Sequence, residues 1–400
     1  ASRGLGDVYK RQVIVRMRGS TGSYACMASA RAQASSEHAL SEEDYLLALS
    51  MPPKAALTHA LAAASKAALQ GPRTGGNPQV GCAILSPAGR IISVGYHRGA
   101  GSAHAEVDAL ANLKEDTGSA PLTAVVTLEP CNHSGKTPPC TRALIKAGIK
   151  NVIWAADDPN PKAAGGGEYL SRQGINAQPA SAVGIEENVL AKARAVSAHW
   201  VQATRRGRPW TIAKVAQTLD GYCAAQDGSS QWITNRLSRA YAHRIRSRVD
   251  VIIAGTGTVI ADNPQLSARL ADGRDLPHQP RPLIVGRRDI PADFYLSGKA
   301  EQARTHELKA VLESCYQRGE IFALLEGGPT LVTAALKANL VDELHIYLAP
   351  RLLGAGRRGI GDLGITALKG SRDFHLRQVK ELGGDVFLAL EKEGAACLPD

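Results

Sequence analysis

The stretch that decides the fold is TLEPCNHSGKTPPC at residues 127–140, preceded by HAE at residues 104–106. An apolar strand is expected to lead into the Pro-Cys pair, and His104 and Cys140 stand where helices are expected to begin. His104, Cys131 and Cys140 offer one imidazole and two thiolates, three good zinc ligands that leave the fourth tetrahedral position for water. Zinc lowers the pKa of such a water towards ~7, and a helix start favours the thiolate form of cysteine. Glu106 is then placed to carry protons between the water and a leaving amine.

The same residues also have a plainer interpretation. A single His-x-Glu pair is common by chance, an acid at a helix start complements the helix dipole, and Cys131 and Cys140 could be ordinary buried thiols. His133 is a rival ligand, which we interpret as a substrate-loop residue because the other three complete a catalytic ligand set. All the elements together, in the order strand, loop and helix, favour the pattern of zinc nucleobase deaminases.

Strands and helices alternate on both sides of this stretch, which predicts an α/β protein. In the first half the expected elements are residues 54–69, 80–85, 90–96, 104–114, 123–128, 140–147 and 151–156. In the second half they are residues 210–216, 234–248, 249–254, 282–285, 321–325, 330–337, 343–348 and 386–391. A polar, charged stretch separates the halves and no repeat relates them. We therefore expect a domain over residues 53–185, a linker over residues 186–208 and a different domain over residues 209–393.

Length and composition narrow the class of protein and the kinds of partner that it can have. A chain of 400 residues is long enough for two or three domains. Its seven cysteines are an odd number, which suits a reducing compartment, and no apolar run approaches the ~20 residues that span a bilayer. We expect a cytoplasmic protein with no membrane partner. The net charge of +10 favours anionic partners without saying whether they are nucleic acids or small phosphorylated molecules.

Residues 1–50 are expected to carry no chemistry. Residues 2–12 look like a translated sequencing adapter, and the rest of this segment is rich in Ala and Ser with several Arg. We interpret it as a disordered or artefactual extension. An organellar transit peptide is the alternative, because such peptides are also rich in Arg and Ser.

The spacing of the two cysteines narrows the class of deaminase. Cytidine, tRNA and nucleic-acid-editing deaminases usually carry Pro-Cys-x-x-Cys, whereas Cys140 follows Cys131 by nine positions. With NPQVG at residues 77–81, GYH at 95–97 and DPNP at 158–161, the interval resembles the deaminase domain of the bifunctional riboflavin-biosynthesis deaminase/reductase family. The resemblance runs from about residue 53 to residue 392.

This resemblance implies a cytidine-deaminase-like, three-layer α/β/α domain with one catalytic zinc. The implied reaction is hydrolytic deamination of 2,5-diamino-6-(5-phosphoribosylamino)pyrimidin-4-one to 5-amino-6-(5-phosphoribosylamino)uracil. Asn77 is then a candidate for reading the pyrimidine edge. Lys136 and His133 are candidates for meeting the phosphate.

Two glycine turns in the second half suit a dinucleotide. GTGT at residues 255–258 follows one expected strand, and GGPT at residues 327–330 follows another strand and begins a helix. Glycines let a ligand approach the backbone, and a helix start offers unpaired N–H groups to a pyrophosphate. No Gly-x-Gly-x-x-Gly motif occurs in the right context, so a standard dinucleotide-binding fold is not supported. Each turn alone could be an ordinary connection between a strand and a helix.

Further motifs occur in the order found in the reductase domain of the same family: LDG at 219–221, SQWIT at 230–234, ADNP at 261–264 and EGGPTL at 326–331. The resemblance implies a dihydrofolate-reductase-like α/β domain in which NADPH delivers a hydride to C1′ and opens the ribosyl group to a ribityl chain. It implies cofactor contacts from Ala216, Trp232, Thr258, Asp262, Gly328, Pro329, Thr330, Leu331, Val332, Thr333 and Ala334. It implies substrate contacts from Ser230, Arg246, Leu266, Arg269 and Glu326.

Some roles in the second half stay open. Lys214 and Asp262 are polar groups near the expected hydride path, and neither is assigned as the proton donor. Arg287 and Arg288 either read the 2′-phosphate of NADPH or form a solvated basic turn. The interval from Asp262 to Glu326 is shorter than is common in the family. The shortening either removes a surface loop or indicates a weakened reductase.

Two other functions compete with the bifunctional enzyme. One is a zinc deaminase whose second domain is inactive; we favour a working reductase because every quoted motif survives. The other is a nucleic-acid base deaminase, which needs a basic groove with stacking aromatics. Only 4% of the residues are aromatic and no clustered basic stripe is visible, so we expect no nucleic-acid partner. By the family resemblance, we expect a homo-oligomer, either a dimer or a tetramer.

Overall fold

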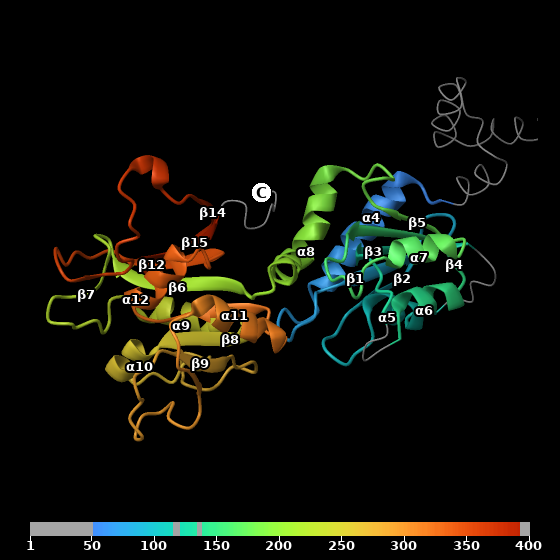
Figure 1. Ribbon diagram of the computed structural model, residues 1–400. Coiled ribbons are helices and arrows are strands. Elements are labelled where there is room, and N and C mark those ends of the chain that lie inside the picture. Colours follow the sequence, from blue (N-terminus) through green and yellow to red (C-terminus); the bar gives the residue numbers. More distant parts are fainter. Residues whose placement is uncertain (1–50, 115–120, 134–137, 393–400) are drawn as a thin grey trace, which may run out of the picture. The chain divides into compact units, whose positions relative to one another are not determined.

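The computed structural model describes residues 51–114, 121–133 and 138–392 (Figure 1). The predictions for residues 1–50 and for Lys136 fall outside these ranges. The strands of the first half form a five-stranded sheet, and those of the second half form an eight-stranded sheet with a small two-stranded sheet beside it.

The five-stranded sheet has helices on both faces. Its order is β2-β1-β3-β4-β5, with bounds β1 Gly81–Leu85, β2 Ile91–Tyr96, β3 Leu122–Leu128, β4 Ile149–Ala156 and β5 Asn176–Pro179. β1 runs antiparallel to β2 and β3, and β3, β4 and β5 run parallel. One helical group is α4 (Lys54–Ala68) with α8 (Glu187–Arg206), and the other is α5 (Ala105–Ala111), α6 (Cys140–Lys146) and α7 (Gly166–Arg172). Every residue of β3 is buried, as expected for a strand covered on both faces. The predicted three-layer arrangement is confirmed.

A glycine in β2 determines how closely α5 approaches the sheet. A Cβ on Gly95 would lie only 2.1 Å from the amide nitrogen of Ala109 and 2.7 Å from the carbonyl oxygen of Ala105. Only glycine fits this position without a shift of the backbone. The close contact fixes the start of α5, where His104 is the N-cap and Glu106 lies in the first turn.

The segment interpreted as a linker, residues 186–208, is a helix for most of its length. α8 spans 20 residues and ends at Gly207, whose φ of +63° lies in the left-handed region that favours glycine. Its buried residues include Leu190, Ala193, Ser197 and Val201, which are spaced three or four apart and form one stripe. That stripe packs against α4, β3 and β4. Charged residues on both sides of this stripe obscure it in the sequence, so the segment was not predicted as a helix. The division of the chain into two domains joined by this segment stays a prediction.

The eight-stranded sheet is parallel except at one edge. Its order is β10-β9-β8-β11-β6-β12-β15-β14, and β15 runs antiparallel to both of its neighbours, β12 and β14. The bounds are β6 Trp210–Thr218, β8 Val251–Gly255, β9 Arg281–Val285, β10 Glu301–Ala303, β11 Phe322–Leu325, β12 Glu343–Ala349, β14 Phe374–Leu382 and β15 Asp385–Lys392. The helices of this half are α9 Arg236–Arg246, α10 Thr256–Asp262, α11 Leu308–Gln317 and α12 Pro329–Lys337. The small sheet pairs β7 (Tyr222–Ala224) with β13 (Arg357–Arg358).

Residues on the two sides of β6, β8 and β11 belong to separate apolar clusters. Ala213, Val251 and Leu325 pack with α11 and α12, whereas Ile212, Ile252 and Leu324 pack in a second cluster with Trp210 and Phe322. This alternation buries both faces of the central strands and leaves their carboxyl ends to form a site. Within the described residues, no helix is long and apolar enough to cross a membrane.

Candidate functional site

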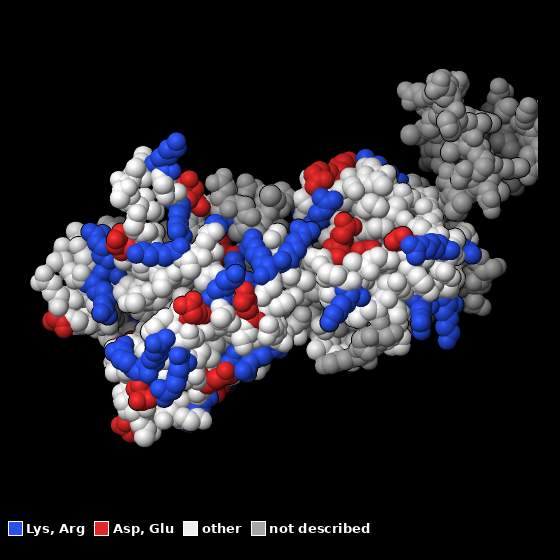
Figure 2. Space-filling model, viewed as in Figure 1, with Lys and Arg blue, Asp and Glu red and all other residues white. Residues whose placement is uncertain are grey.

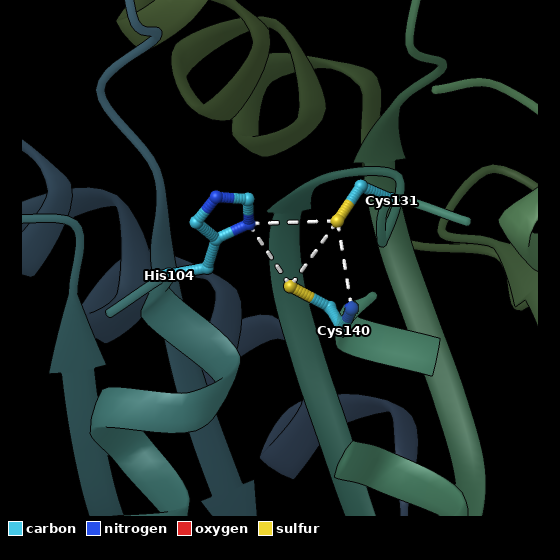
Figure 3. A group of neighbouring side chains, drawn as sticks. All are labelled: His104, Cys131 and Cys140. Carbon is cyan, nitrogen blue, oxygen red and sulfur yellow. Dashed lines mark hydrogen bonds between the residues drawn. The ribbon is translucent and has the colours of Figure 1, made fainter. Parts of the chain in front are cut away.

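Three predicted zinc ligands meet between α5, β3 and α6 (Figure 3). Nδ1 of His104 lies 3.1 Å from Sγ of Cys140 and 3.5 Å from Sγ of Cys131, and the two sulfur atoms are 3.5 Å apart. Ligand atoms around a tetrahedral zinc, with bonds of about 2.0–2.3 Å, lie roughly 3.5–3.8 Å from one another. Two of the three distances match this range and the third is slightly shorter, so one zinc ion fits among the three atoms, and Nδ1 is the ring nitrogen of His104 that faces the sulfur atoms. His133 is not part of this group among the described residues.

The surroundings of Cys131 favour its negatively charged thiolate form, which suits the binding of a metal cation. The hydrogen bond shared by the two thiols lowers the pKa of Cys131 to about 4 and raises the pKa of Cys140. The backbone N–H of Cys140, at the start of α6, also donates to the sulfur of Cys131 at 3.4 Å. A thiolate here, stabilised by a helix start, is a ready metal ligand.

Glu106 lies beside the ligands in the first turn of α5 and is only 3% exposed. Burial raises its pKa, and so does the nearby Cys131, although His104 opposes the shift. A buried carboxyl group that holds its proton more tightly than an exposed one suits a proton carrier.

Asn77 and His97 extend the site along its open side. Nδ1 of His97 lies 3.0 Å from the carbonyl oxygen of Ala103, to which it donates, so its Nε2 accepts a hydrogen bond from the Asn77 amide at 2.9 Å. The rings of His97 and His104 meet edge to face, with centroids 5.4 Å apart. Burial lowers the pKa of His97, which keeps the ring neutral and this arrangement intact. The amide of Asn77 is thus held with its carbonyl oxygen available as an acceptor.

The DPNP motif quoted from the sequence, which follows β4, places a partly buried acid near this site. Asp158, in the DPNP motif, accepts from the backbone N–H of Asn160, and burial raises the pKa of Asp158 to about 6. His133 lies near enough to oppose that shift, and its Nδ1 is buried without a partner among the described residues.

The second half contains a cavity of about 1200 Å³ at the carboxyl ends of β6, β8, β9 and β11. The structure brings together here nearly all the residues that the resemblance singled out: Ala216, Ser230, Trp232, Arg246, Thr258, Asp262, Leu266, Arg269, Glu326, Gly328, Pro329, Thr330, Leu331 and Ala334. Two are not brought to the cavity. Val332 is buried in the apolar core, and the hydroxyl of Thr333 accepts a hydrogen bond from the backbone of Gly361.

The two glycine turns form one wall of this cavity. The hydroxyl of Thr258 accepts a hydrogen bond of 2.6 Å from the backbone N–H of Gly328 and so joins the turns. Gly328 precedes Pro329 at the start of α12, where helix N–H groups point outward. Arg287 and Arg288 line the same cavity at the end of β9.

An ion-pair cluster of Glu326, Arg246 and Lys214 lines one part of this cavity, which we call its floor. Arg246 holds Glu326 with two hydrogen bonds, Nε to Oε2 at 2.8 Å and Nη2 to Oε1 at 2.7 Å, and Lys214 adds a third contact at 3.4 Å. Burial opposes ionisation, but these cations outweigh it and hold the pKa of Glu326 well below its usual range. Arg246 also donates to the carbonyl oxygen of Ser267, so most of its hydrogen-bonding capacity is used within the protein.

Sequence reasoning missed several side chains on the cavity wall, among them Arg239, His243 and Tyr347. Arg239 lies over the ring of Trp232 at 4.3 Å, and it shares one face of α9 with His243 and Arg246. The spacing of three and four residues along α9 could have indicated this polar face. Tyr347 lies inside a strand of mostly apolar residues, where no sequence signal marks it.

Comparison with known proteins covers both halves. The family model for the cytidine and deoxycytidylate deaminase zinc-binding region matches residues 54–156, and the model for the RibD C-terminal domain matches residues 209–388. The riboflavin biosynthesis protein RibD of Mycobacterium tuberculosis is 41% identical over 318 residues, which cover 78% of this chain and 90% of that protein. RibD of Escherichia coli K12 is 33% identical over 351 residues, covering 78% and 93% of the two chains.

Solved structures are similar to this chain along most of its length. Acinetobacter baumannii RibD matches with a TM-score of 0.73 at 34% identity, covering 85% of this chain and 99% of that one. A Thermotoga maritima protein described as a diaminohydroxyphosphoribosylaminopyrimidine deaminase/5-amino-6-(5-phosphoribosylamino)uracil reductase matches with a TM-score of 0.69 at 27% identity, covering 85% and 99%.

Proposed function

This chain belongs to the RibD family, and from that premise we propose that the His104–Cys131–Cys140 group and the 1200 Å³ cavity are the two active sites of one enzyme. The family assignment makes the chain a bifunctional deaminase and reductase of riboflavin biosynthesis that uses zinc and NADPH. What the proposal adds is the role of each residue.

In the deaminase site, His104, Cys131 and Cys140 hold the metal. Zinc bound there supplies the activation of a water molecule near neutral pH. Glu106 takes up a proton from the attacking water and delivers it to the leaving amine, because it lies beside the ligands and is closed off from bulk water. The carbonyl oxygen of Asn77 accepts from the pyrimidine edge, since His97 already holds its amide N–H.

In the reductase site, the glycine turns and Thr258 hold the dinucleotide, and NADPH supplies the hydride. The substrate is 5-amino-6-(5-phosphoribosylamino)uracil, the product of the first site. Basic side chains outnumber acidic ones on the wall, with Lys214, Arg239, Arg246, Arg269, Arg287, Arg288 and Arg357 against Asp262 and Glu326. Two polyanions suit that excess of positive charge.

The hydrogen bonds of the two predicted arginines support different roles for them. Arg246 is engaged by Glu326 and Ser267, whereas Nε of Arg269 is buried without a partner among the described residues. We assign phosphate binding to Arg269 and the shaping of the floor to Arg246. Near the glycine turns, Arg288 approaches Gly257 so closely that a Cβ there would lie 2.8 Å from its guanidinium. This position supports Arg288 as the reader of the 2′-phosphate of NADPH.

The net charge of +10 does not require a nucleic-acid partner. Figure 2 shows basic and acidic side chains interspersed over one face, and much of the basic excess lines the reductase cavity. Matches to RibD along most of the chain favour the bifunctional enzyme over a nucleic-acid deaminase.

We also propose that the chain forms a homo-oligomer through the β14 edge of the large sheet. Among the described residues β14 pairs with β15 alone, and its Leu376 and Val379 are 55% and 57% exposed. An exposed edge strand of nine residues that carries apolar side chains among its polar ones is a template for pairing with a second copy. Sedimentation of the wild-type chain and of a Val379→Lys variant tests this: a dimer or tetramer that dissociates in the variant supports it, and a wild-type monomer contradicts it.

The single observation that carries the deaminase assignment is the convergence of three ligand atoms within 4.8 Å. The test is the zinc content and ammonia release of Cys140→Ala against Cys82→Ala, a buried cysteine of β1 outside the ligand group. Cys140→Ala should lose zinc and deamination together, and Cys82→Ala should keep both. Zinc retained at full stoichiometry in Cys140→Ala would refute the assignment.

A further inference from the structure

A buried tyrosine on the floor of the reductase cavity carries an unused hydrogen-bond donor. Tyr347 lies on β12 and is 1% exposed, yet it lines the cavity. Its phenolic oxygen has no hydrogen-bond partner among the described residues. A buried hydroxyl without a partner is costly, so its persistence on a cavity wall points to a partner that arrives with a ligand.

The position of the ring is fixed from several sides. Phe387 and Tyr241 pack against it with ring centroids 5.0 Å and 6.5 Å away, and Nζ of Lys214 lies 5.7 Å from its centroid. In the sheet, Tyr347 pairs directly with Ala216 of β6, a predicted cofactor contact. A ring held in this way keeps its hydroxyl in one place.

The neighbours of Tyr347 indicate which ligand it meets. Glu326 and Arg246 are the charged groups of the floor that act on the phenol, and both are predicted substrate contacts. The charges of Glu326 and Arg246 are already paired with each other, since Glu326 accepts two hydrogen bonds from Arg246. Tyr347 thus lies between the expected cofactor wall and the expected substrate floor, where the reacting carbon of the substrate has to lie.

We propose that the Tyr347 hydroxyl is a further substrate-binding group of the reductase and donates a hydrogen bond to an oxygen atom of the phosphoribosylaminouracil. Burial raises the pKa of the phenol, so it remains a neutral donor at every working pH. Arg269 shares this property: among the cavity-lining residues, Arg269 and Tyr347 each leave a buried polar donor without a protein partner. The inference rests on the proposed reductase function of this cavity.

The variant Tyr347→Phe removes one oxygen atom and keeps the ring. With saturating NADPH and preformed aminouracil substrate, we expect kcat/KM for the substrate to fall about three- to tenfold, the effect of one neutral hydrogen bond. The KM for NADPH and the rate of deamination should stay at wild-type values. The midpoint of urea unfolding without ligands should not fall, because the protein itself gives this hydroxyl no partner. Tyr241→Phe is the matched control: its hydroxyl donates to Gln378 at the surface, and its kinetics should not change.

Four outcomes would overturn the inference. An unchanged kcat/KM would show that the hydroxyl does not contact the substrate, and a rise confined to the KM for NADPH would place it on the cofactor. A lower urea midpoint with unchanged kinetics would show that it holds a structural water. If the wild-type enzyme itself failed to oxidise NADPH, the proposed function of the cavity would fall, and this inference with it.

Discussion

Replacing Glu326 with alanine should damage the reductase and leave the deaminase intact. The carboxylate of Glu326 is held by Arg246 through two hydrogen bonds and by Lys214 through one contact. Side-chain exposures are 13% for Glu326, 14% for Arg246 and 22% for Lys214, so the cluster is largely withdrawn from water. In Glu326→Ala both cations lose their counter-charge on the cavity floor.

The size of the effect follows from this burial. Removing one partner of a buried ion pair costs roughly 3–5 kcal/mol, because the remaining charge is left uncompensated. Here the floor is open to the solvent of the cavity, so we expect the lower end, about 3 kcal/mol of unfolding free energy. Without Glu326 to hold it, Arg246 no longer shapes the floor. We therefore expect reductase kcat/KM to fall at least about a hundredfold.

Glu320→Ala is a matched control. Glu320 is also gripped by two hydrogen bonds from one arginine, Arg281, at 2.6 and 2.8 Å, but that arginine is 29% exposed and the pair lies outside the cavity. It should lose only about 1 kcal/mol and keep reductase activity. Urea unfolding, ammonia release and NADPH oxidation measured on both variants decide the matter. An equal loss of both activities in Glu326→Ala would refute the independence of the two sites, and unchanged stability would refute the argument from burial.

Three further predictions concern the other groups. Glu106→Gln should keep its zinc and lose deamination, as measured by metal analysis and ammonia release; normal turnover would exclude the proton-carrying role. Removal of zinc by a chelator should abolish deamination and spare NADPH oxidation with preformed aminouracil substrate, because all three metal ligands lie in the first half; loss of both activities would contradict this. Burial and the charge of Arg246 lower the pKa of His243 from 6.5 to about 4. As pH falls, the unfolded chain takes up that proton first, so stability should decline between about pH 6.5 and pH 4, by about 1–2 kcal/mol once partial exposure is allowed for. The decline should be smaller in His243→Gln, measured by urea unfolding at about pH 7 and pH 4.5; the same decline in both proteins would rule His243 out as its source.

The zinc site could be predicted from the sequence because its parts are local. His104 and Glu106 belong to one helix start, and Cys131 and Cys140 flank one loop, so short motifs already bring the ligands close. Residue type then indicates the metal, since one imidazole with two thiolates is a ligand set typical of zinc. The structure added what no motif contains, namely that Nδ1 is the nitrogen of His104 that faces the two sulfur atoms.

The reductase site was less predictable because it is assembled from distant strands and helices. The run 328–334 is an example: successive side chains of a helix point about 100° apart, so those of Val332 and Thr333 lie away from the cavity, and their predicted cofactor contacts stay a prediction. Tyr347 is a cavity residue that no motif indicated, because it reaches the floor only through the pairing of β12 with β6.

Several elements escaped prediction, and in α8 and β14 the reason lies in the packing. The apolar stripe of α8 is formed largely by small side chains such as Ala193 and Ser197, which charged neighbours mask. β14 is exposed along nearly its whole length, so it lacks the alternation of apolar and polar residues that indicates a strand. Hydrogen bonding to β15 stabilises it instead.

The most direct test of the central claim is a coupled assay on the zinc-loaded wild-type chain. The diaminopyrimidinone ribosylamino phosphate is supplied with and without NADPH, while ammonia and the nicotinamide absorbance are followed together. Ammonia release in both reactions, followed by NADPH oxidation at a matching stoichiometry, is the expected result. Ammonia release without NADPH oxidation would contradict a working reductase, and no ammonia from zinc-loaded protein would contradict the assignment of the first site.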